Sequence, residues 1–152
     1  MSEKKIRALI VDDHSILRAG LANILEAESD IEIIGEARDG VEAIDRAKDL
    51  SPDVILMDIF MPRCDGMEAL QTIKECLPSA RVLILTVSER EEDLFQALKF
   101  GAQGYLLKSA NVSEVVEAVR RTAAGEVALS PEMAIRLAAK FRENAIEPKL
   151  SS

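Results

Sequence analysis

The sequence predicts an α/β fold: a doubly wound, five-stranded parallel sheet with helices on both faces. Five short apolar runs alternate along the 152 residues with five segments whose apolar residues recur every three to four positions. The runs are continuously apolar, which is typical of strands covered on both faces. Repeated strand–helix units of this kind form parallel sheets, and the length suits one domain with a short appendage.

The apolar runs are expected to be the strands, because they are too short for helices. They occupy residues 6–11, 31–36, 54–57, 82–85 and 104–107. The expected core-facing helical stripes run from Ile16 to Leu25, from Val41 to Ala47, from Met67 to Leu77, from Leu94 to Leu98 and from Val112 to Val119. An acceptor side chain with Glu three positions later predicts helix starts at Asp39, Asp65, Ser88 and Asn111.

A C-terminal linker helix is expected beyond the sheet, at about 131–144. Ser130 and Pro131 are typical of a helix start. Apolar residues then recur at helical spacing as far as Phe141, and Pro148 is expected to prevent continuation beyond about Asn144.

The charge balance argues against nucleic-acid binding by this chain. It has 27 acidic and 19 basic residues, a net charge of −8, whereas nucleic-acid binders carry positive surfaces. A protein partner or a metal ion fits better. No apolar run approaches the ~20 residues of a membrane span, and the N-terminus does not have the pattern of a secretory signal. We therefore expect a cytoplasmic protein without membrane association. Cys64 and Cys76 are expected to be reduced thiols.

Polar side chains follow the predicted strands. Asp12 and Asp13 follow the first strand, Asp58 the third, Thr86 the fourth and Lys108 the fifth. These strand ends lie side by side in a parallel sheet, at the edge where such sheets bind ligands. Two carboxylates ~4 Å apart repel by about 4 kcal/mol near a protein surface. A magnesium ion, which favours carboxylates and phosphates, would offset that repulsion.

This set of groups predicts phosphoryl transfer. An aspartate can act as the nucleophile and form an aspartyl phosphate. Asp58 is the best candidate because it stands alone on the central strand, and Asp12 and Asp13 then form the metal end of the site. Lys108 and Thr86 supply a cation and a hydroxyl for the phosphoryl oxygens. His14, which opens the first helix, is interpreted as a surface residue.

The motifs at these strand ends together resemble the receiver domain of bacterial two-component response regulators. They are Val11–His14, Met57–Pro62, Asp65–Gly66, Leu85–Thr86 and Gly104–Lys108. The resemblance covers residues 5–125 in the family's order and spacing. It implies a flavodoxin-like sheet with strand order 2-1-3-4-5, followed by a linker at 126–152.

The resemblance also implies roles for individual residues. Asp58 would accept a phosphoryl group from a sensor histidine kinase. Magnesium would be bound by Asp12, Asp13 and Asp58 with the backbone carbonyl of Phe60, and Lys108 would contact the phosphoryl group. Such a domain catalyses only its own phosphorylation and dephosphorylation, and is not an enzyme acting on another substrate.

Further implied roles concern the change of state. Thr86 would move toward the phosphoryl group and Tyr105 would turn inward as a coupled switch, whereas the simpler interpretation of Tyr105 is a half-buried ring. Pro62 and Gly66 would shape the loop over the site. A homodimer is expected through helix 4, strand 5 and helix 5, or through helices 1 and 5.

Three segments resemble the NarL/LuxR type of response regulator: Asp12–His14, Gly104–Lys108 and Gly125–Pro131. That type carries a linker helix and then a helix-turn-helix domain. We therefore expect a fragment of a transcription regulator whose DNA-binding domain would lie beyond residue 152, so that DNA would be bound only through that domain.

Two other functions stay open. One is a phosphorylation-independent receiver that serves as an interaction platform. The other is a magnesium-dependent aspartyl-phosphate phosphatase. Such phosphatases usually carry an Asp-x-Asp motif after the first strand. This chain has adjacent Asp12 and Asp13 there instead.

Overall fold

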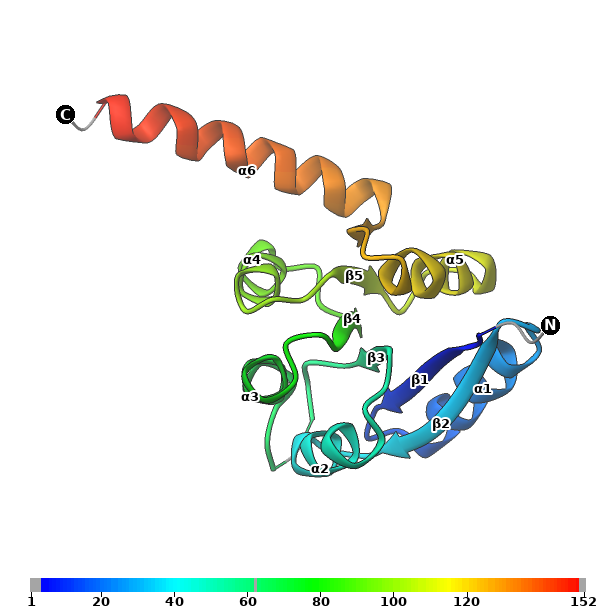
Figure 1. The fold of residues 1–152 in the computed structure, drawn as a ribbon. Coiled ribbons are helices and arrows are strands. Elements are labelled where there is room, and N and C mark those ends of the chain that lie inside the picture. Colours follow the sequence, from blue (N-terminus) through cyan, green and yellow to red (C-terminus); the bar gives the residue numbers. More distant parts are fainter. Residues whose placement is uncertain (1–3, 62, 151–152) are drawn as a thin grey trace.

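The computed structural model describes residues 4–61 and 63–150, which form one sheet with helices on both faces (Figure 1). The predicted role of Pro62 and the last two residues of the predicted linker lie outside the described residues. In chain order the elements are β1 (Ile6–Val11), α1 (Ser15–Glu26), β2 (Ile31–Ala37), α2 (Gly40–Leu50), β3 (Val54–Met57), α3 (Gly66–Cys76), β4 (Arg81–Thr86), α4 (Glu91–Lys99), β5 (Gly104–Leu107), α5 (Val112–Ala123), β6 (Ala128–Leu129) and α6 (Pro131–Leu150).

The sheet has the order β2-β1-β3-β4-β5-β6, and all five pairings are parallel. The predicted doubly wound sheet and the order of its first five strands are therefore confirmed. Strand β6 was not expected. It places Ala128 beside Gly104 and Leu129 beside Tyr105, and two residues are too few to show a strand pattern in the sequence.

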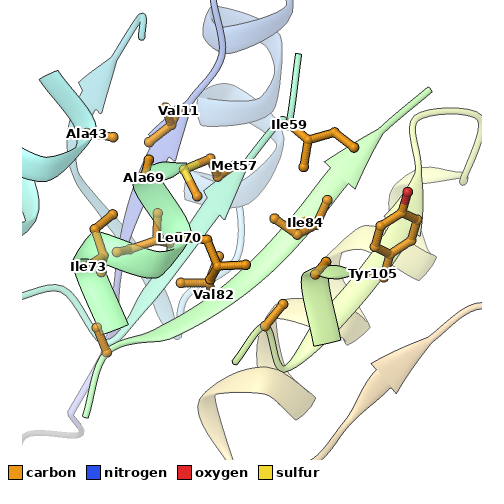
Figure 2. Packing of buried hydrophobic residues seen from close by; sticks show 14 of the residues in the cluster. Val11, Ala43, Met57, Ile59, Ala69, Leu70, Ile73, Val82, Ile84 and Tyr105 are labelled. Atoms are coloured by element: carbon orange, nitrogen blue, oxygen red, sulfur yellow. The ribbon is translucent and has the colours of Figure 1, made fainter. Parts of the chain in front are cut away.

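Two apolar clusters hold the helices on the sheet. Alternate residues of a strand face opposite sides, so Leu9 and Val11 of β1 belong to one cluster and Ala8 and Ile10 to the other. The first cluster packs against α2, α3 and α4 (Figure 2), and the second packs against α1 and α5. Each buried Leu or Ile stabilises the fold by about 1.5–3 kcal/mol.

The predicted apolar stripes are wrong at the first turn of three helices. Ile16, Val41 and Val112 are 88%, 37% and 54% exposed. Each of these helices starts just beyond the carboxyl end of a strand. The first turn therefore projects past the sheet, and the helix meets the core only from its second turn onward.

The predicted helix starts are confirmed at three positions. The side chains of Asp39, Asp65 and Asn111 each accept a hydrogen bond from the backbone N–H three residues later. Ser88 is not a cap, because α4 begins at Glu91. The Ser88 hydroxyl instead donates to Asp93 Oδ2 at 2.5 Å.

Helix α6 starts at Pro131 as predicted but continues to Leu150, beyond the predicted end near residue 144. Residues with high helix propensity, such as Arg142 and Glu143, extend it past the last apolar position.

Two smaller expectations concern thiols and membranes. Cys64 and Cys76 are free, as predicted. Burial and neighbouring carboxylates raise the pKa of the Cys64 thiol, which disfavours the reactive thiolate. Within the described part of the chain, no helix combines the length and apolarity that crossing a membrane requires.

Candidate functional site

The carboxyl ends of β1, β3 and β5 bring three charged side chains together. Lys108 Nζ lies 2.7 Å from Asp12 Oδ2 and 2.9 Å from Asp58 Oδ2. The side chains of Asp12 and Asp58 are 4% and 3% exposed, and that of Lys108 is 14% exposed. The structure therefore gathers three of the predicted site residues in one buried cluster.

Backbone hydrogen bonds at the strand ends fix this cluster. Asp58 N donates to Val11 O at 3.2 Å, and Lys108 N donates to Thr86 O at 2.7 Å. The backbone of Asp12 donates to the end of β2 at 3.0 Å. The backbone of each charged residue thus continues the hydrogen bonding of the parallel sheet. These bonds fix the positions from which the three side chains converge.

The electrostatics of the cluster favour its charged forms. Burial alone would raise the pKa of Asp12, but hydrogen bonds from Lys108 and His14 lower it below the usual 3.8. Burial alone would lower the pKa of Lys108, but hydrogen bonds to Asp12 and Asp58 raise it above the usual 10.5. At neutral pH the lysine is therefore a fixed cation beside buried negative charge.

Asp13 and His14 form the solvent-facing side of the cluster. His14 Nδ1 lies 2.9 Å from Asp12 Oδ1 and 3.2 Å from Asp13 Oδ1. The side chain of His14 is 66% exposed, and the residue is the N-cap of α1, as expected. Its contact with both aspartates was missed, and its position directly after them was the one sequence signal for it.

The donor set at this edge fits a magnesium ion. Ligand atoms of Asp12, Asp13 and His14 lie within 4.8 Å of one another. Magnesium prefers carboxylate oxygens and keeps several waters, and the exposed side of Asp13 leaves room for water. Lys108 supplies one positive charge against the carboxylates of Asp12, Asp13 and Asp58, so the cluster keeps an excess of negative charge that attracts a cation.

The loop after β3 folds back onto Asp58. Gly66 N donates to Ile59 O at 3.0 Å. A β-carbon at Gly66 would lie 2.3 Å from the Asp58 carbonyl oxygen, so only glycine fits there. Phe60 N donates to Asp58 Oδ1 at 3.3 Å, while the Phe60 ring is 50% exposed. The loop therefore holds the backbone of Phe60 beside the carboxylate, and its side chain lines the same surface hollow as Asp13.

Thr86 and Tyr105 lie behind the cluster, joined through Ser88. Both side chains are fully buried. Ser88 N donates to Thr86 Oγ1 at 3.3 Å, and Tyr105 Oη donates to Ser88 O at 3.2 Å. Tyr105 belongs to the apolar cluster that includes Ile84 (Figure 2) and is fully buried, so its ring is neither half-buried nor turned outward. Among the described residues, no hydrogen bond joins Thr86 to Asp58.

Comparisons with known proteins identify the family of the chain. The family model described as "Response regulator receiver domain" matches residues 8–120. The response regulator protein VraR of Staphylococcus aureus is 39% identical over 140 residues, which cover 92% of this chain and 67% of VraR.

Two solved structures extend the comparison. A LuxR-family two-component response regulator from Aurantimonas sp. SI85-9A1 superposes with a TM-score of 0.86 at 33% identity, covering 91% of this chain and 99% of that one. The signal receiver domain of NarL from Mycobacterium tuberculosis gives a TM-score of 0.79 at 34% identity, covering 82% and 100%.

Proposed function

This chain belongs to the family of response regulator receiver domains, and on that premise we propose that Asp58 accepts a phosphoryl group from a sensor histidine kinase. The observation that carries the proposal is the buried bridge from Lys108 to Asp12 and Asp58. A buried charge cluster is a weak source of stability, because desolvation offsets much of its attraction. Such clusters are typical of functional sites.

In the proposed reaction, a carboxylate oxygen of Asp58 attacks the phosphorus of the kinase phosphohistidine. A P–O bond forms to Asp58 while the P–N bond breaks, and the leaving imidazole nitrogen keeps the electron pair. Lys108 moves from Asp58 Oδ2 to a phosphoryl oxygen. Its hydrogen bonds to Asp12 and Asp58 raise its pKa above the usual 10.5, so Lys108 enters the reaction as a cation. Water later hydrolyses the acyl phosphate, so the domain acts only on itself.

We assign the magnesium ion to Asp12, Asp13, Asp58 and the backbone carbonyl of Phe60. When bound, the ion neutralises charge on the transferring phosphoryl group. These donors are oxygens, as magnesium prefers. Asp12 Oδ1, which accepts a hydrogen bond from the His14 backbone on the solvent-facing side, is the oxygen of Asp12 that would face the ion, because Oδ2 is bound by Lys108.

The output of the proposed phosphorylation runs through the segment behind the site. The Thr86 hydroxyl moves toward the phosphoryl group. Tyr105 takes its inward position together with the loop at Ser88, to which both residues are hydrogen-bonded. A second copy binds through α4, β5 and α5, or through α1 and α5. Two observations favour the face formed by α1 and α5. Its first-turn residues Ile16 and Val112 are exposed, and α6 contacts α4 on the alternative face.

The proposed partners of the whole regulator follow from charge. The chain carries a net charge of −8, so we assign DNA binding and transcriptional output to sequence outside residues 1–152. The domain itself is proposed to work in the cytoplasm, where a histidine kinase presents its phosphohistidine.

Intact-mass analysis after incubation with acetyl phosphate and Mg²⁺ tests this function. The parent should gain one phosphoryl group, and omission of Mg²⁺ or the Asp58→Asn substitution should abolish it. Asp49→Asn, at an exposed position on α2, is the matched control and should keep the adduct. An unmodified parent that still binds Mg²⁺ would support the phosphatase alternative through rapid turnover. An unmodified parent that binds no Mg²⁺ would support the interaction platform.

A further inference from the structure

Helix α6 is anchored to the loop that precedes α4. Arg136 on α6 donates a hydrogen bond to the backbone carbonyl of Glu89, and its Nη2 lies 3.6 Å from the Glu89 carboxylate. The same guanidinium is held in place by Glu132, one turn earlier, at 3.2 Å. Glu89 directly precedes Arg90, the N-cap of α4, whose side chain makes no capping bond. Arg136 therefore ties α6 to the start of α4.

Apolar contacts seat the first half of α6 on the same region. Met133 is fully buried, and it shares a hydrophobic cluster with Tyr105 and Leu94. Leu137 packs against that cluster. Lys140 Nζ lies 5.7 Å from the centre of the Phe95 ring on α4. Figure 1 shows α6 running from β6 toward the side of the domain that carries α4.

The anchoring loop is also the loop that holds the proposed switch residues. Ser88, next to Glu89, accepts the hydroxyl of Tyr105 on its carbonyl and donates from its N–H to Thr86. Its own hydroxyl donates to Asp93 on α4. The backbone from Thr86 to Glu89 is therefore bonded at one end to the switch and at the other to α6.

We infer that the docked position of α6 and the inward position of Tyr105 belong to one state. Phosphorylation of Asp58 then tightens α6 on α4, and a docked α6 favours phosphorylation. The inference rests on the proposed function and adds α6 as its readout. An outward turn of Tyr105 would break the bond to Ser88, loosen the Glu89 carbonyl that Arg136 binds, and leave a void beside Met133.

Coupling between two sites is reciprocal in binding free energy. A change at α6 must therefore alter the affinity of the phosphorylation site by the same factor by which phosphorylation alters α6 docking. Typical couplings of this kind change an equilibrium by about 5–150-fold. This reciprocity separates α6 as a coupled element from α6 as a passive tether, which would respond to nothing at Asp58.

The test uses the full chain and two arginine variants of α6. Arg136→Ala removes the anchor. Arg142→Ala is the matched control, because Arg142 is exposed on the same helix and no hydrogen bond or ion pair of its side chain is found within the described residues. The first readout is amide hydrogen exchange over residues 133–143, with and without acetyl phosphate and Mg²⁺. The second is the affinity for beryllofluoride, a phosphoryl analogue, in the presence of Mg²⁺.

We expect exchange in this segment of the parent to slow about fivefold or more on phosphorylation. Arg136→Ala should exchange faster without phosphate and bind beryllofluoride more weakly by a similar factor, while Arg142→Ala should match the parent in both. Unchanged or faster exchange in a parent that carries the phosphoryl group would overturn the coupling and leave the proposed function standing. So would equal effects of the two variants. A parent with no adduct would overturn the function and the coupling together.

Discussion

Lys108 and Asp58 form a buried ion pair across β4, with Nζ and Oδ2 2.9 Å apart. The two residues follow β5 and β3, whose axes are separated by two strand spacings of about 4.8 Å each. A long side chain is needed to cross that gap, and lysine provides it. The same Nζ reaches Asp12 beyond the end of β1 at 2.7 Å. One cation therefore bridges two carboxylates that follow two other strands.

Replacing Lys108 by alanine should destabilise the fold, because two carboxylates then lie buried without a cation. Breaking a buried pair costs about 3–5 kcal/mol, and we expect the lower end because Lys108 keeps 14% exposure. Added Mg²⁺ should restore part of the loss by supplying positive charge. Urea unfolding with and without Mg²⁺ measures both effects. Lys99→Ala, at an exposed position on α4, should change little, and a similar loss in both variants would contradict the explanation.

Stability should fall in acid partly through Asp12. Its pKa in the folded state lies below the usual 3.8, so its contribution is complete above about 3.8 and is lost as the pH falls through the lower folded value. The urea midpoint of the parent should therefore drop steeply below about pH 4. Asp12→Asn should show a shallower drop over that window than Asp49→Asn. Parallel curves for the two variants would show that Asp12 does not contribute.

Alanine at Gly66 should disrupt the loop over the site, because its β-carbon would lie 2.3 Å from the carbonyl oxygen of Asp58. Backbone cannot move aside cheaply, so we expect a loss of about 1–3 kcal/mol and a strongly reduced yield of phosphorylated protein. Gly20→Ala is the opposite control. Nothing lies within 4 Å of a β-carbon there, and alanine inside α1 should stabilise by about 0.5–1 kcal/mol. Equal unfolding midpoints for the two variants would refute the argument.

The convergence of the strand ends could be predicted from the sequence because a parallel sheet leaves little freedom there. Once the apolar runs are strands in the confirmed order, the residues after β1, β3 and β5 must meet at one edge. The bridge from Lys108 to Asp12 and Asp58 could not be predicted, since it depends on side-chain rotamers rather than on position along a strand.

The errors share a physical cause, which is that local patterns do not report tertiary contacts. Ser88 has the spacing of a capping residue, but Tyr105 and Asp93 bind it in the folded chain. Ile16 and Val112 continue their helical stripes beyond the end of the sheet, where there is no core to meet. Helix α6 was expected from its pattern, whereas its anchor at Glu89 lies 47 residues away from Arg136 in the sequence.

Phe60 should slow the hydrolysis of the phosphorylated domain. Its backbone donates to Asp58 at 3.3 Å, while its side chain is half exposed in the surface hollow that Asp13 also lines. We expect this apolar ring to hinder the water that attacks the acyl phosphate, because it neither orients nor attracts water. Phe60→Asn should therefore lose its phosphoryl group about 3–10-fold faster, a change of roughly 1 kcal/mol in the barrier. The decay of the adduct followed by intact mass measures this rate. Val127→Asn makes a comparable exposed apolar-to-polar change, at a 54% exposed residue beside β6, and should decay like the parent. A Phe60→Asn adduct that persists as long as the parent's would mean that access past this ring does not limit hydrolysis.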